Sequence, residues 1–126
     1  MAGLRFSSLN CHGLSDDVVS YLHSIISEFD FVLLLETWLS NFNSHTLNNI
    51  SDDFIYFHNS AMETKLRSGI LTGRPFGGTA ILVRRCFADK VSVVPSDNPR
   101  ITAICWAFSV QPDLFIGNCE CVHALD

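Results

Sequence analysis

Two polar side chains, Asn10 and Glu36, stand where short apolar segments end, and their types can bind cations or phosphate groups. Asn10 closes the segment 4–10, and Glu36 follows the continuous apolar run Phe31–Leu35. Both segments are predicted strands, and in open α/β sheets ligands bind beyond the carboxyl ends of the strands. A carboxylate there either holds a ligand or simply caps a helix or pairs with an arginine. The two residues therefore form a candidate site, but the residue types alone do not decide between these roles.

The other residues that could carry chemistry show no metal-binding spacing. The histidines are scattered, and the five cysteines include no Cys-x-x-Cys pair. We interpret the cysteines as reduced, mostly buried thiols of an intracellular protein, nuclear or cytoplasmic. Trp38 and Trp106 are predicted to lie in the core.

The charge of the chain is uneven. The net charge is −5, so the chain as a whole has no electrostatic attraction to nucleic acid. Basic residues nevertheless concentrate in one stretch, which is either a local basic surface or a solvated loop followed by a strand end. These residues are Lys65, Arg67, Arg74, Arg84 and Arg85.

Residues 4–36 are predicted to form a strand, a helix and a second strand, the unit that would position both candidate residues. Ser15 supplies a capping hydroxyl, and Asp16 and Asp17 place acidic groups where the helix dipole favours them. An apolar stripe then follows at helical spacing, so the helix should end near Glu28. A strand–helix–strand unit is typical of α/β folds.

The rest of the chain is predicted to be rich in strands. The polar segment 39–53 is predicted to be a loop with at most one helical turn, followed by a short strand over 54–57 and a long glycine-containing connection over 59–78. Short turns between the later strands favour antiparallel hairpins. We therefore predict an α/β fold with a largely antiparallel sheet. The later strands are Thr79–Arg84, Val91–Val94, 101–110 and 114–117.

The composition is that of one folded domain. With 126 residues, 48% of them apolar and 17% charged, the chain is neither disordered nor of low complexity. Its most apolar run, Phe31–Leu35, is far shorter than the roughly 20 residues that a membrane span needs. The N-terminus also lacks the apolar stretch of a signal peptide. We expect one domain without a membrane partner.

Several motifs, taken in order, resemble the endonuclease/exonuclease/phosphatase superfamily. The first strand of that family ends in Asn, followed by a turn with Gly-Leu, as in residues 8–14 (SLNCHGL). Its second motif is Gln-Glu-Thr after an apolar lead, which residues 34–39 (LLETWL) resemble. The Gly-Gly strand entry in residues 73–82 (GRPFGGTAIL) is similar to the branch found in non-LTR (LINE-type) retrotransposons, as is the segment 57–62 (FHNSAM).

The resemblance implies a fold and an activity. The fold is a four-layer α/β sandwich of two mixed, largely antiparallel β-sheets flanked by helices. The activity is metal-dependent phosphodiester hydrolysis that nicks DNA. In such enzymes the residue matching Glu36 binds Mg²⁺ or Mn²⁺, and the residue matching Asn10 lies beside it and orients metal or phosphate. Hard oxygen ligands of this kind suit Mg²⁺. The loop holding Lys65 and Arg74 lies near the substrate in the family, which implies that both bind nucleic acid.

The later family motifs do not match. Neither the Asp-x-Asn block nor the Ser-Asp-His block occurs among the 126 residues. We therefore expect residues 1–126 to be the N-terminal portion of such a domain, truncated. Where the family has Tyr-x-Pro, this chain has Glu120 and Val122. Substitution of the missing groups by Glu120 or His123 stays open, although His123 is expected to be an exposed tail residue.

Two functions of different classes follow. The first is a retrotransposon-type, Mg²⁺-dependent endonuclease. The second is a catalytically inactive remnant that binds nucleic acid or protein. A phosphoesterase acting on a lipid or small molecule is disfavoured by the segment 73–82. Because half of a two-sheet sandwich would leave an apolar sheet face bare, we also expect self-association.

Overall fold

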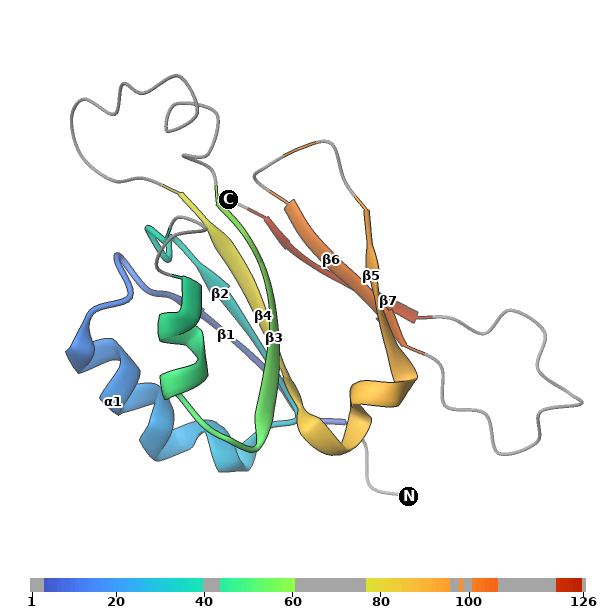
Figure 1. Ribbon diagram of the computed structural model, residues 1–126, viewed down its shortest axis with the longest axis horizontal. Helices are drawn as coiled ribbons and strands as arrows, with labels where there is room; N and C mark the ends of the chain where they lie inside the picture. Colours follow the sequence, from blue (N-terminus) through green and yellow to red (C-terminus); the bar gives the residue numbers. More distant parts are fainter. Residues whose placement is uncertain are drawn as a thin grey trace, which may run out of the picture.

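The protein consists of two β-sheets packed face to face, with helices on the outer face of the larger sheet (Figure 1). The computed structural model describes residues 4–39, 44–60, 77–95, 98, 101–106 and 120–125, the last range as backbone. The helices are α1 (Asp16–Ile25) and the short 3₁₀ helices η1 (Ile26–Glu28), η2 (Ser44–Asn49) and η3 (Arg85–Lys90). The strands are β1 (Phe6–Asn10), β2 (Phe31–Leu35), β3 (Phe54–Asn59), β4 (Thr79–Arg84), β5 (Val91–Val94), β6 (Ile101–Trp106) and β7 (Glu120–Leu125).

The unit β1–α1–β2 has the predicted strand–helix–strand form. Ser15 caps α1, its hydroxyl accepting a hydrogen bond from the Val18 amide at 3.3 Å. Leu22 and Ile26 are buried against the sheet, and the helical turns end at Glu28 as predicted. Because the helix crosses over between the strands, β1 and β2 run parallel, with Asn10 opposite Leu35. The carboxyl ends of both strands therefore meet at one edge of the sheet.

The larger sheet has the order β1-β2-β4-β3, and β4 is antiparallel to both of its neighbours. The central strands β2 and β4 are almost entirely apolar and buried, as expected for strands covered on both faces. One register row crosses the whole sheet at the end where β1 and β2 finish. It consists of Asn10, Leu35, Thr79 and Asn59.

The smaller sheet, β5-β6-β7, is antiparallel and packs over β2 and β4. The core between the sheets contains Phe31, Ile81, Val83, Ile104 and Trp106. The other face of the larger sheet packs on α1, η1 and η2 through a second apolar cluster. Figure 1 shows the resulting layers: helices, the larger sheet, then the smaller sheet. The predicted α/β sandwich of two largely antiparallel sheets is confirmed, with the larger sheet mixed and the smaller one wholly antiparallel. In the described residues the layers are one of helices and two of strands, whereas the resemblance implies helices on both outer sides.

The end of the sheet opposite the row of Asn10 is closed by an ion pair. Asp30, 9% exposed, accepts hydrogen bonds from Nε of Arg84 at 3.2 Å and from the backbone N–H of Arg5 at 2.9 Å. Arg85 donates to the Asp52 carbonyl at 2.9 Å. Arg84 is thus the last residue of β4 and Arg85 the first of η3, whereas the other basic residues of the stretch lie outside the described residues.

Two predictions need correction. Residues 120–125 form β7, paired with β6, so His123 lies in a strand and not in a tail. The face of the larger sheet expected to be bare is covered by the smaller sheet, and self-association stays a prediction. The whole predicted strand 114–117 and the last part of the predicted strand 101–110 lie outside the described residues. In the part of the chain that the structure describes, no helix has the length and apolar character needed to cross a membrane.

Candidate active site

Asn10 and Glu36 lie at neighbouring strand ends, as the sequence predicts. The backbone pairing of β1 and β2 continues past the strands, because the Cys11 amide donates to the Leu35 carbonyl and the Gly13 amide to the Glu36 carbonyl, both at 2.8 Å. The two segments that carry the candidate residues are therefore held together by their main chains. Asn10 is exposed, at the rim of the face that packs on the smaller sheet.

Glu36 is held in an unusual conformation. Its φ is +54°, in the left-handed region that side-chain-bearing residues rarely adopt. Its carboxylate oxygen Oε2 accepts hydrogen bonds from Nε1 of Trp38 at 3.0 Å and from the amide of Gly77 at 3.2 Å. Left-handed residues that the surrounding structure enforces cluster at functional sites. The fold therefore fixes the direction of this carboxylate.

The Gly77–Gly78 pair explains how the chain can approach Glu36 so closely. The Thr37 amide donates to the Gly78 carbonyl at 3.1 Å, and the Trp38 amide donates to the Gly77 carbonyl at 2.8 Å. A Cβ atom on Gly78, whose φ is +92°, would lie 2.5 Å from Oγ1 of Thr37. Only glycine fits there, so the Gly-Gly motif brings an amide donor to the Glu36 carboxylate.

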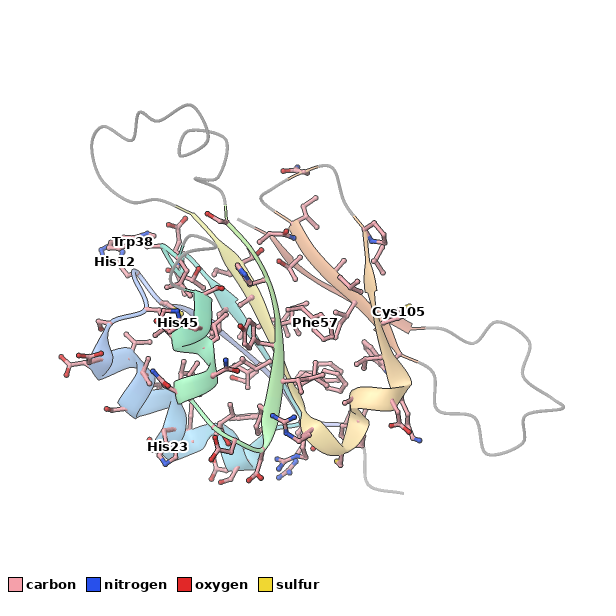
Figure 2. The ribbon with its side chains drawn as sticks, viewed as in Figure 1. His12, His23, Trp38, His45, Phe57 and Cys105 are labelled. Atoms are coloured by element: carbon pink, nitrogen blue, oxygen red, sulfur yellow. The ribbon has the colours of Figure 1, made fainter. Side chains whose placement is uncertain are left out.

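Asn10 shapes the neighbouring turn. Its Oδ1 accepts a hydrogen bond from the His12 amide at 3.1 Å, an Asx turn in which His12 has a φ of +49°. The His12 ring lies 5.0 Å from the Trp38 ring, and Figure 2 shows these two side chains together at this end of the molecule. Asn10, His12, Glu36 and Trp38 thus form one cluster.

Trp38 corrects one prediction and adds a site residue. The sequence predicts that both Trp38 and Trp106 lie in the core, but only Trp106 is buried there, and Trp38 is half-buried beside Glu36. The two tryptophans differ because Trp106 lies within a strand facing the other sheet, whereas Trp38 follows the strand end. Its position two residues after Glu36 was the sequence signal available for this role.

A buried polar cluster lies under the same end of the sandwich, and sequence reasoning missed it. Oγ1 of Thr79 and Oγ1 of Thr102 are 2.6 Å apart, and Nδ2 of Asn59 donates to the Ile101 carbonyl at 2.6 Å. These hydrogen bonds join the larger sheet to β6. They lie close to the candidate site, because Thr79 on β4 pairs with Leu35 on the neighbouring strand β2. No spacing pattern in the sequence brings Asn59, Thr79 and Thr102 together, since the contacts depend on the packing of the two sheets.

The other residues considered for the site are Lys65, Arg74, Glu120 and His123, and the structure does not show any of their side chains in this cluster. Lys65 and Arg74 lie outside the described residues. The backbone of Glu120 pairs with Trp106, at the end of the sandwich where Phe31 lies and four strand positions from the row of Thr102. That separation is about 13 Å along a strand, and substitution of a missing ligand by Glu120 stays a prediction. The backbone of His123 is nearer, opposite Ala103.

Residues 7–120 match the family model described as the endonuclease/exonuclease/phosphatase family. The chain belongs to this family. No curated protein sequence matches it. Among solved structures, it is similar to an AP endonuclease from Leishmania major, with a TM-score of 0.69 and 14% identity, covering 98% of this chain and 40% of that one. It is also similar to a 3′ phosphatase from Neisseria bound to a product DNA hairpin, with a TM-score of 0.52 and 11% identity, covering 83% of this chain and 38% of that one.

The side chains at this site offer some, but not all, of the oxygen ligands that a hard divalent cation needs. The Glu36 carboxylate and the Asn10 amide oxygen are ligands of the kind that Mg²⁺ accepts, with water completing the coordination. Within the described ranges, no three His, Cys, Asp or Glu residues gather as a metal site. The neighbouring Cys11 is a poor ligand candidate, because its thiol is buried and soft, whereas Mg²⁺ prefers hard oxygen ligands. Asn10 and Glu36 are therefore the residues that would hold the cation.

Proposed function

We propose that this chain provides the Asn10–Glu36 part of a metal-dependent phosphodiesterase that nicks DNA. The observation that carries the proposal is the Glu36 carboxylate, which is fixed by two donors at a strand end of a family domain, beside Asn10. The chain spans about two fifths of the two similar enzymes, 40% and 38% of their lengths. The activity of a complete protein is thus part of the proposal.

Each residue has a definable task in this scheme. Glu36 supplies the negative charge for Mg²⁺ or Mn²⁺, and its hydrogen bonds from Trp38 and Gly77 hold the carboxylate ready without further reorganisation. Asn10 presents an amide at the rim to orient cation or phosphate. When bound, such a cation polarises the phosphate and stabilises the leaving oxygen.

DNA is the proposed substrate, and a non-LTR retrotransposon the proposed origin. DNA as the partner is supported by the similar structures, an AP endonuclease and a 3′ phosphatase bound to a product DNA hairpin. The segments 57–62 and 73–82 support the retrotransposon branch. Lys65 and Arg74 are proposed to contact the DNA phosphates. A nuclear or cytoplasmic location is likewise a proposal.

A second candidate is a catalytically inactive module that binds nucleic acid or protein. The observation that favours it is that, within the described residues, no group of three or more His, Cys, Asp or Glu side chains could hold a metal ion. Catalysis by this chain alone would then require groups supplied by another segment or another chain.

Nicking of supercoiled plasmid distinguishes the two candidates. We expect the purified chain to nick plasmid with Mg²⁺ but not with EDTA, and Glu36→Ala to abolish nicking. Glu28→Ala is the matched control, because Glu28 is an exposed acid in η1 and should leave nicking unchanged. Folded protein that never nicks supports the inactive module. Nicking that persists in Glu36→Ala would refute the assigned site.

A further inference from the structure

The indole of Trp38 is fixed on two sides. A Cβ atom on Gly13 would lie 2.5 Å from Cε3 of Trp38, so the turn at Gly13, whose φ is +92°, lies directly against the ring. The His12 ring contacts it with centroids 5.0 Å apart and planes tilted by 53°. The Trp38 backbone is also in the left-handed region, with a φ of +58°, and its amide donates to the Gly77 carbonyl. The ring therefore has little freedom to turn away from Glu36.

Two groups that donate to the Glu36 carboxylate reach the same oxygen. Nε1 of Trp38 and the amide of Gly77 both donate to Oε2, at 3.0 and 3.2 Å. A carboxylate has about four acceptor positions on its two oxygens, so two of those on Oε2 are taken by groups with fixed positions. The amide of Gly77 is part of the main chain, whereas the indole N–H of Trp38 is a donor that a side-chain substitution can remove.

We infer that Trp38 is the positioning residue for Glu36, and that its indole N–H sets the affinity of the site for a divalent cation. The inference rests on the proposed function, because it assigns Trp38 a role only if Glu36 binds a cation. Groups that hydrogen-bond a metal-binding carboxylate fix its orientation, and their loss typically weakens metal binding 10- to 100-fold. An indole that only packed against the turn would have no such effect.

Trp38→Phe separates these roles, since phenylalanine keeps an aromatic ring against Gly13 and His12 but lacks the N–H. We would titrate the full chain with Mn²⁺ by calorimetry. The expected result is a dissociation constant raised about 10- to 100-fold in Trp38→Phe. Trp106→Phe is the matched control: it alters the core between the sheets, should lower the thermal midpoint, and should leave Mn²⁺ binding unchanged.

The outcomes are distinguishable. If the wild-type chain binds Mn²⁺ and Trp38→Phe binds it equally well, the inference is wrong and the proposed function stands. If the folded wild-type chain does not bind Mn²⁺, both are wrong. Should Trp38→Phe fail to fold, the indole N–H resonance of the wild-type chain provides the test. That resonance must shift in Glu36→Gln and on addition of Mg²⁺, and a resonance that moves in neither case overturns the inference.

Discussion

At the scale of single residues, the site depends on backbone conformations that a sequence pattern does not display. His12, Glu36 and Trp38 are the non-glycine residues with positive φ in the described part of the chain, and all of them lie in one cluster. Each such conformation costs about 1–3 kcal/mol. The main-chain bonds between the segments after β1 and β2 and the Gly77–Gly78 pair enforce this arrangement.

Replacement of Gly78 should show how tightly the segments are packed. Gly78→Ala places a side chain at a φ of +92° and a Cβ atom 2.5 Å from Oγ1 of Thr37. We expect the free energy of unfolding to fall by at least about 1–3 kcal/mol in urea titrations. In a double-mutant cycle, Thr37→Ala should relieve part of the loss by removing the clashing hydroxyl. Strictly additive effects would contradict the close contact.

Cys11 should make stability depend on pH in the alkaline range. Burial raises its pKa from 9.0 to about 12, so the unfolded chain loses the thiol proton first as pH rises. Stability from this group is complete below about pH 9 and is lost progressively toward pH 12. Unfolding free energies measured between pH 8 and 10 should therefore fall more steeply in wild type than in Cys11→Ala. Equal slopes would show that Cys11 does not contribute.

At the scale of elements, the parts that repeat a local pattern were predictable. The capped helix at Ser15, the strand Phe31–Leu35 and the strands Thr79–Arg84 and Val91–Val94 follow from spacing and turn residues, and the structure confirms them. The position of Asn10 and Glu36 at adjacent strand ends was also predictable. The strand pairing of 120–125 was not, because it depends on a distant partner in β6. The same holds for Trp38, whose role depends on Gly77.

The contacts of Asp30, at the end of the larger sheet opposite the candidate site, can be tested with variants that leave the site residues unchanged. Asp30→Ala leaves the Arg5 amide without its carboxylate partner and removes the ion pair of Arg84. We expect a loss of about 1–3 kcal/mol in the free energy of unfolding, with Mn²⁺ affinity unchanged. Asp89→Ala is the control, because the 80% exposed Asp89 side chain pairs weakly with Lys90 and its loss should cost at most about 0.5 kcal/mol. Similar losses in both variants would contradict a structural role for Asp30.

At the scale of the whole molecule, the two ends of the sandwich have different tasks. One end carries the ion pair of Asp30 with Arg84, which joins two strand ends of the larger sheet, and the aromatic packing of Phe31 on Trp106, which joins the two sheets. The other end carries Asn10, Glu36 and Trp38 above the hydrogen bonds between the sheets. This division is consistent with the α/β rule that ligands bind beyond the carboxyl ends of strands.

The most direct test of the central claim is the position at which Mn²⁺ binds, measured by its paramagnetic broadening of backbone amide resonances. We predict that the amides of residues 10–13, 36–38 and 77–78 broaden first, that those around Asp30 and Arg84 do not, and that Glu36→Ala removes the effect. Broadening that begins elsewhere, for example at the exposed pair Asp52 and Asp53, or that persists in Glu36→Ala, would contradict the account.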